Sequence, residues 1–69
     1  MVKLTRLRAI RERSALTQQE LANLAGVGRA TVVRVESGED EPFPRTTRKL
    51  AKALRVKPAD LMEPLEGER

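Results

Sequence analysis

The sequence contains no cysteine and no histidine, and these two absences exclude several classes of protein. Without cysteine there is no disulfide scaffold, and without either residue the usual ligand sets for zinc and other transition metals are missing. Tyrosine is absent as well, and the remaining carboxylates, lysines and hydroxyl groups form no convincing catalytic set. We therefore expect no metal, no cofactor and no enzymatic activity.

Long hydrophobic runs are also lacking. No apolar stretch approaches the ~20 residues that cross a membrane, and the first residues lack the uninterrupted apolar segment of a secretory signal. The sequence therefore predicts a cytoplasmic protein without a membrane partner. Its 69 residues have room for one domain with one core, which packing alone must hold together.

Basic residues outnumber acidic ones by 14 to 10, and the pI is near 10.4. The charges are grouped along the chain: residues 1–38 hold seven bases and three acids, 39–41 are all acidic, and 45–57 hold six bases and no acid. Such grouping is consistent with one basic face that meets a polyanion. Arginines and lysines that merely solvate helix surfaces would give the same composition, so charge alone leaves both interpretations open.

Glycine, proline and capping residues divide the chain into five predicted helices. The second begins after Thr17, whose hydroxyl can accept from the backbone of Glu20 while the Glu20 carboxylate reaches back. It ends at Gly26, which adopts the left-handed conformation without steric cost. The predicted helices cover residues 2–13, 18–25, 29–37 and 44–54, and Pro58 opens a final short turn or helix that contains Leu61 and Met62.

The stretch TVVRV at 31–35 has four β-branched residues in five positions, a composition that favours a strand. Helical spacing instead places Val32 and Val35 together on an inward face. The outward face then consists of Ala30, Val33, Arg34 and Ser37. A β-branched residue costs a helix a few tenths of a kcal/mol, whereas burying a valine gains about 1.5 kcal/mol or more. We therefore predict a helix over 29–37 that ends at Gly38.

This pattern of helix, glycine-containing turn and helix resembles the helix-turn-helix of the Cro/Xre family of phage-repressor-like DNA-binding proteins. The residues that carry the resemblance are Gln18, Leu21, Ala22, Gly26, Val27, Val32 and Val35, and it extends over about 4–62. It implies an all-α, compact five-helix bundle in which residues 1–63 form a helix-turn-helix DNA-binding domain and 64–69 a short, loosely ordered tail. A plain five-helix bundle, whose glycine and alanines only satisfy packing, is the alternative.

The resemblance implies two groups of DNA contacts, because the second motif helix of such proteins lies in the major groove while the first crosses the backbone. The residues expected on base edges are Arg29, Ala30, Val33 and Arg34. Those expected on phosphates are Gln18, Ser37 and Arg45. Arginine pairs with guanine through two hydrogen bonds, and a small apolar side chain can rest against a thymine methyl group. Alternatively, Val33 is a tolerated surface valine and Gln18 an ordinary exposed helix residue.

Glu36 is placed by the helical wheel toward the core, where a lone carboxylate would be costly. The family pairs this position with an arginine of the first helix, which implies a structural ion pair between Arg11 and Glu36. The loop with Glu39, Asp40 and Glu41 departs from relatives, in which it is often basic or polar. These acids would oppose a phosphate backbone, so they point away from DNA, lower non-specific affinity or meet a protein partner.

The leading hypothesis is a sequence-specific DNA-binding transcriptional regulator, a repressor, that binds double-stranded DNA as a homodimer. Leu61, Met62 and Leu65 are the expected dimer interface, because they supply more apolar surface than the end of a small monomer needs. The resemblance places such a protein in a prokaryotic cell or a phage genome. The alternative is a protein-interaction module of the same fold, such as an antitoxin or a regulatory partner subunit.

Overall fold

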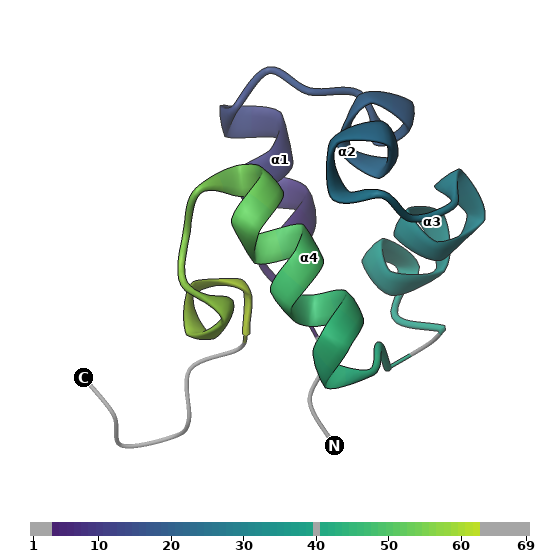
Figure 1. The fold of residues 1–69 in the computed structure, drawn as a ribbon, viewed down its shortest axis with the longest axis vertical. Coiled ribbons are helices and arrows are strands. Elements are labelled where there is room, and N and C mark those ends of the chain that lie inside the picture. The colour runs from purple at the N-terminus through teal and green to yellow at the C-terminus, as the bar shows by residue number, and fades with distance from the viewer. Residues whose placement is uncertain (1–3, 40, 63–69) are drawn as a thin grey trace.

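The computed structural model describes residues 4–39 and 41–62 and is all-helical over these ranges. Its elements are α1 (Leu7–Arg13), α2 (Gln18–Ala25), α3 (Arg29–Ser37), α4 (Pro44–Leu54) and the 3-10 helix η1 (Pro58–Leu61) (Figure 1). The all-α class is confirmed, but the count of five α-helices is wrong. The last element has only four residues, because the backbone is extended at Lys57 before it and at Met62 after it. It is therefore a single turn of 3-10 helix. The tail at 64–69 lies outside the described residues.

The helix α1 begins later than the sequence predicted. The prediction was residues 2–13, of which 2 and 3 lie outside the described residues, and the helix starts only at Leu7. The backbone N–H of Arg6 instead donates to the carbonyl of Leu61 at 3.1 Å, and the N–H of Leu7 donates to Leu4 at 3.1 Å. A turn therefore precedes α1 and buries Leu4 while tying the start of the chain to η1.

The helix α2 has the predicted start and end. The Thr17 hydroxyl accepts from the N–H of Glu20 at 3.0 Å, and the Glu20 carboxylate accepts from the N–H of Thr17 at 2.8 Å. This capping box satisfies two of the N–H groups that a helix start leaves without partners. Gly26 ends the helix with a φ of 72°, in the left-handed region.

A residue with positive φ follows each of the four α-helices. At Gly26 and Gly38 this conformation was predicted, but Ala15 and Arg55 adopt it too, with φ values of 60° and 58°. In all four cases the next N–H bonds back to the last turn, as in the hydrogen bond of 3.0 Å from Val56 to Ala51. Two of these reversals therefore use residues with a Cβ atom, for which the left-handed conformation is strained.

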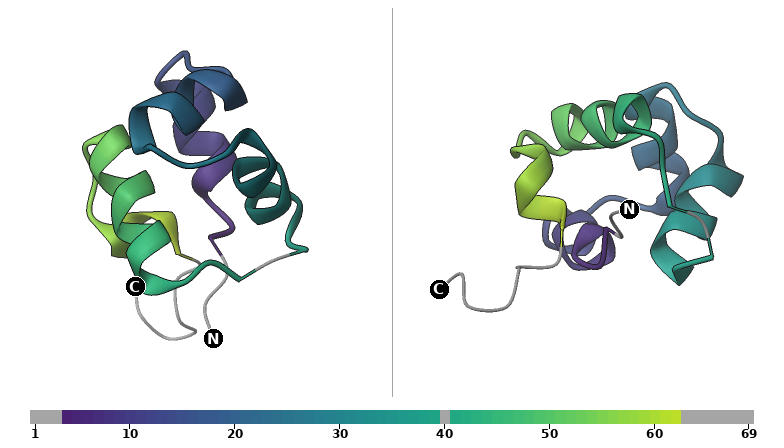
Figure 2. Two further views of the ribbon diagram at one scale, coloured as in Figure 1. Left: turned by 45° about the vertical axis from the view of Figure 1, so that its right-hand side comes forward. Right: turned by 90° about the horizontal axis from the view of Figure 1, so that it is seen from below.

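The stretch at 31–35 is helical, as predicted, because tertiary packing outweighs its preference for a strand. Val32 is completely buried and Val35 is 4% exposed. In space, α2 packs against both α3 and α4, and α4 packs against η1. The helices surround a common interior (Figure 2). Buried side chains from every element fill it. Within the described part of the chain, every helix is too short or too polar to span a lipid bilayer.

Candidate nucleic-acid interface

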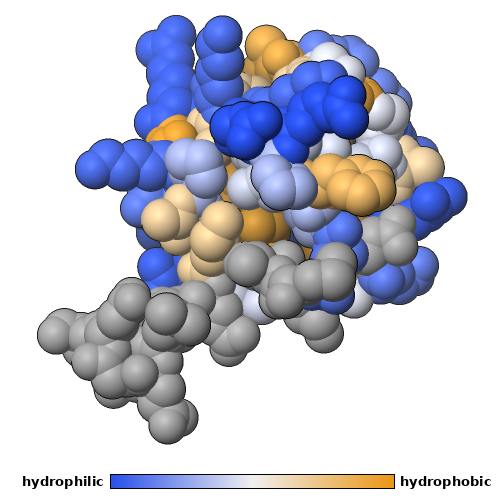
Figure 3. All heavy atoms as spheres, turned by 60° about the horizontal axis from the view of Figure 1, so that its bottom comes forward, coloured by the Kyte–Doolittle hydropathy of each residue, from blue (hydrophilic) through white to orange (hydrophobic). Residues whose placement is uncertain are grey.

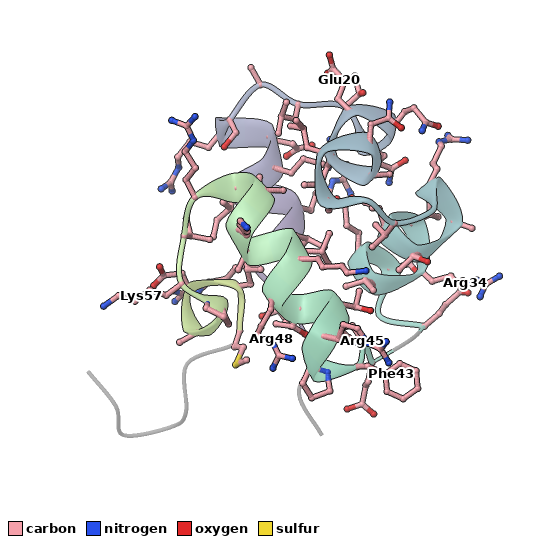
Figure 4. The ribbon with its side chains drawn as sticks, viewed as in Figure 1. Glu20, Arg34, Phe43, Arg45, Arg48 and Lys57 are labelled. Carbon is pink, nitrogen blue, oxygen red and sulfur yellow. The ribbon has the colours of Figure 1, made fainter. Side chains whose placement is uncertain are left out.

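The outer face of α3 presents the four side chains that the sequence assigned to base contacts. Arg29, Ala30 and Arg34 are exposed, and Val33 is 37% exposed, one of three large hydrophobic side chains exposed among the described residues. Arg34 extends outward from α3 (Figure 4). Because Val32 and Val35 anchor the opposite side in the core, this face is held toward solvent by a rigid element. The contacts with bases remain a prediction.

The ion pair expected between Arg11 and Glu36 is present and joins α1 to α3. The Arg11 Nε donates to Glu36 Oε2 at 2.5 Å and its Nη2 donates to Oε1 at 3.1 Å, a two-pronged contact. The two side chains are only 10% and 4% exposed. The hydrogen bond to Glu36 raises the pKa of the Arg11 guanidinium against the opposing effect of burial, and the negative charge of Glu36 raises it further. Arg11 therefore stays charged inside the domain.

Gln18, the first residue of α2, is joined to the same carboxylate. Its Nε2 donates to Glu36 Oε1 at 3.1 Å, and the residue is half-buried. The third guanidinium nitrogen of Arg11, Nη1, donates to the carbonyl of Leu16 at 2.7 Å. One carboxylate on α3 thus holds side chains from α1 and α2, which fixes the orientation of the Gln18 amide. This contact distinguishes Gln18 from an ordinary exposed helix residue, although its role toward DNA is a prediction.

A polar hollow of about 480 Å³ lies where α1, α2 and α3 meet. It is lined by Arg8, Arg11, Thr17, Gln18, Val33, Glu36 and Ser37. The hollow brings two predicted phosphate contacts, Gln18 and Ser37, next to the predicted base contact Val33. The Ser37 hydroxyl donates to the carbonyl of Arg34 at 3.0 Å, so it must give up this bond before it can donate to a phosphate.

Sequence reasoning missed Arg8. Arg8 lines the hollow from α1, and its guanidinium forms an exposed i,i+4 pair with Glu12, with side chains 70% and 56% exposed. Such a pair is weak in water, so Arg8 can turn to another anion at little cost. The available signal was the three-residue spacing to Arg11, which places both arginines on one side of α1.

Residues 5–65 match the family model described as a helix-turn-helix domain. The chain belongs to this helix-turn-helix domain family. Its relatives include the HTH-type transcriptional repressor RghR of Bacillus subtilis, 44% identical over 57 residues that make up 81% of this chain and 42% of RghR. An uncharacterized HTH-type transcriptional regulator of Archaeoglobus fulgidus is 39% identical over 57 residues, 83% of this chain and 81% of the archaeal protein. The chain therefore spans less than half the length of RghR.

Two solved structures share the fold. The restriction-modification controller protein C.AhdI of Aeromonas hydrophila superposes with a TM-score of 0.80 at 38% identity, covering 83% of this chain and 86% of C.AhdI. The P22 c2 repressor, solved in complex with a synthetic operator, gives a TM-score of 0.78 at 31% identity, covering 84% and 88%. These matches confirm the resemblance to phage repressors.

Other predicted site residues of this helix-turn-helix protein lie away from the hollow. Arg45 is exposed near the start of α4, beside Phe43 (Figure 4), and is absent from the hollow lining. In the acidic loop, Glu39 is exposed and Glu41 half-buried, and Asp40 lies outside the described residues. A protein partner for this loop therefore remains a prediction.

The expected dimer interface needs a correction at Leu61. This side chain is completely buried in the core of the protomer, because η1 packs against α4, so it has no surface to offer to a second copy. Met62 is half-buried and accessible in part, and Leu65 lies outside the described residues. Any interface must therefore use side chains other than Leu61.

Proposed function

We propose that this helix-turn-helix protein is a sequence-specific DNA-binding transcriptional regulator, a repressor, that inserts α3 into the major groove. One observation carries the proposal: an outer face with two arginines, Arg29 and Arg34, on a helix that buried valines and the Arg11–Glu36 pair hold in place. The similarity to RghR, described as a transcriptional repressor, and to the P22 c2 repressor crystallised with an operator supports the same function.

The face of α3 has the chemistry for direct reading of bases. Arg29 stands in the first turn, the part of such a helix that approaches base edges in helix-turn-helix complexes. A guanidinium can donate two hydrogen bonds to O6 and N7 of guanine, whereas Ala30 and Val33 suit the methyl group of thymine. Each good two-pronged pair contributes about 1–3 kcal/mol of discrimination against the wrong base.

The hollow between α1, α2 and α3 has the chemistry for a phosphate. The Gln18 amide can donate a hydrogen bond, and the Ser37 hydroxyl can do so once it releases the Arg34 carbonyl. Arg8 offers a positive charge, and the N-terminus of α2 adds the positive end of its dipole. Contacts to phosphates fix register and affinity without reading sequence. This division assigns specificity to α3 and general affinity to the hollow.

A single domain of this size makes too small a contact for tight discrimination, so the regulator acts as a homodimer. Twofold symmetry of the protein matches a roughly palindromic operator, with half-sites about one helical turn apart.

Selection of bound sequences from a random pool of double-stranded DNA tests the proposal. A self-complementary consensus is expected for the wild-type protein, and Arg29→Ala should cost about 1–3 kcal/mol at that consensus and relax one base preference. Lys52→Ala, which removes the same charge from α4, is the matched control and should keep the preference. If no sequence is enriched, the proposal is overturned and the alternative, an antitoxin or regulatory partner subunit, becomes the better explanation.

A further inference from the structure

Phe43 is the single aromatic residue of the chain, and it lies on the surface. Its exposed fraction is 76%, larger than that of any other large hydrophobic side chain among the described residues. The proposed DNA-binding face of α3 accounts for Val33, but it does not include Phe43. An exposed aromatic side chain with apolar neighbours is typical of an interaction site.

The neighbours of Phe43 make a continuous apolar surface, which we name the Phe43 patch: Pro42, Phe43, Pro44 and Met62, flanked by Glu41 and Arg48. Hydrophobic residues stand out among hydrophilic ones on the face that includes the start of α4 (Figure 3). The backbone at Phe43 is fixed, because its carbonyl accepts the N–H of Thr47 at 3.0 Å and the Thr47 hydroxyl at 3.3 Å. An aromatic side chain has only two torsion angles, so it loses little entropy when a partner covers it.

Phe43 forms a ridge between two hollows. One, of about 430 Å³, also includes Pro58, Met62 and Arg48, and the other, of about 350 Å³, includes Thr31, Val35 and Glu41. Pro42 and Phe43 line both hollows. A ridge with a hollow beside it is complementary to a second copy of itself, since a twofold axis brings the ridge of each copy into the hollow of the other.

The charges beside the ridge have the same self-complementary arrangement. Arg48 lines one hollow and Glu41 the other, so a twofold axis close to Phe43 places Glu41 of each copy opposite Arg48 of the partner. Within residues 4–39 and 41–62, neither side chain forms an ion pair. Two copies would therefore gain two ion pairs that the described residues of one protomer do not make.

We propose that the Phe43 patch is the surface through which two copies of this chain associate. The inference gives the homodimer of the proposed function its interface, and it replaces Leu61 by Phe43 while retaining Met62. The patch shares no residue with the hollow assigned to phosphate, so a second copy would leave that hollow open.

Sedimentation equilibrium of the full chain without DNA, from micromolar to millimolar concentration, tests the surface directly. We expect a reversible dimer in the wild type, and Phe43→Ser should raise its dissociation constant about tenfold or more, as loss of a central aromatic contact does. Leu24→Ser is the matched control, since Leu24 is 62% exposed on α2. Equal effects of the two variants, or a wild type that stays monomeric throughout, would overturn the proposal.

Reversal of the flanking charges tests the twofold arrangement. Glu41→Arg and Arg48→Glu should each weaken association, because like charges then meet across the axis, and the double variant should bring the dissociation constant back to within a few fold of the wild type. A double variant that associates more weakly than both single variants would contradict the arrangement.

Residues 63–69 of the same chain are the other candidate to cover the patch. In that case Phe43→Ser would lower thermal stability and leave the mass measured by sedimentation unchanged, and this result would overturn the proposal.

Binding to DNA separates this inference from the proposed function. On a site selected from the random pool, Phe43→Ser should lower affinity for the palindrome and leave affinity for an isolated half-site unchanged. An equal loss on both would mean that Phe43 contacts DNA, against the inference. If no DNA sequence is selected but the wild type dimerises through the patch, the proposed function fails and the inference stands.

Discussion

The carboxylate of Glu36 joins segments that are far apart in the sequence. It accepts hydrogen bonds from Arg11, 25 residues away, and from Gln18, 18 residues away. Every buried polar side-chain atom in the described part of the chain has a hydrogen-bond partner, so this network is complete. A satisfied buried ion pair adds little compared with an apolar replacement, but breaking it leaves an uncompensated charge. The network therefore specifies the position of α3 more than it adds to total stability.

Replacing one partner of this pair should be costly. Glu36→Gln should lower the free energy of unfolding by about 3 kcal/mol, since the Arg11 charge stays buried without a carboxylate. Urea unfolding measures this change. Because the pKa of Arg11 is raised, its contribution is fully present below the ordinary arginine pKa and is lost only as the pH rises through the raised value.

The exposed pair between Arg8 and Glu12 provides the control for Glu36→Gln. Glu12→Gln should cost less than about 0.5 kcal/mol, because both side chains are exposed to water. Similar losses in the two variants would show that the Arg11–Glu36 pair behaves as a surface contact. The double variant Arg11→Met with Glu36→Leu should be more stable than Glu36→Gln alone, since no charge is left unpaired.

Gln18 should act on affinity rather than on sequence preference. Gln18→Ala removes the amide and should weaken binding about fivefold, because one hydrogen bond contributes about 1 kcal/mol. The loss should be the same for the selected site and for single-base variants of that site. Titrations with a panel of DNA duplexes measure this. A changed order of preference among the duplexes would show that Gln18 does not contact a phosphate.

At the scale of elements, some helix ends are set by neighbouring residues in the sequence and others by tertiary packing. The capping box of α2 and the glycines at 26 and 38 involve residues within one turn of each other, and these boundaries were predicted from the sequence. Ala15 and Arg55 reverse the chain in the same conformation without the glycine that makes it inexpensive. Their strain is offset by the packing of the helices that they connect.

Glycine at the end of α4 should therefore stabilise the domain. Arg55→Gly removes the left-handed strain and adds unfolded-state entropy, with a net gain of up to about 1 kcal/mol, which corresponds to a melting temperature about 4–8 °C higher in a domain of this size. Thermal unfolding followed by circular dichroism measures the shift. The opposite exchange, Gly26→Ala, should cost about 1 kcal/mol through backbone strain alone, because a Cβ atom there meets no other atom within 4 Å. A lower melting temperature for Arg55→Gly would show that the Arg55 side chain stabilises the domain by more than its left-handed backbone destabilises it.

At the scale of the whole molecule, the excess of 14 bases over 10 acids predicts binding that depends strongly on salt. The logarithm of the association constant should fall linearly with the logarithm of salt concentration, with a slope of about −0.9 for each phosphate neutralised. Arg8→Ala should make this slope less steep by about 0.9, whereas Gln18→Ala removes no charge and should leave it unchanged. A flat dependence for the wild type would favour the partner-module alternative, and an unchanged slope for Arg8→Ala would exclude Arg8 from the phosphate contacts.

The candidate site was predictable where one helix carries it. The outward set on α3 follows from a helical period of 3.6 residues, and the structure exposes all four predicted side chains. The polar hollow was not predictable as a unit, since three helices form it and Arg8 reaches it from the first. The Arg11–Glu36 pair came from a family resemblance, because no local rule connects residues so distant in the sequence.

By itself, the sequence determined the bounds of α2, α3 and α4 and the face that α3 turns to solvent. Caps, glycines, prolines and apolar periodicity act over a few residues, so their effect can be read along the chain. Only the tertiary structure decided that α1 starts at Leu7, that Leu61 is buried and that Phe43 is exposed. These outcomes depend on contacts between distant segments, such as the hydrogen bond from Arg6 to Leu61, which settle which apolar side chains fill the single core and which remain for a partner.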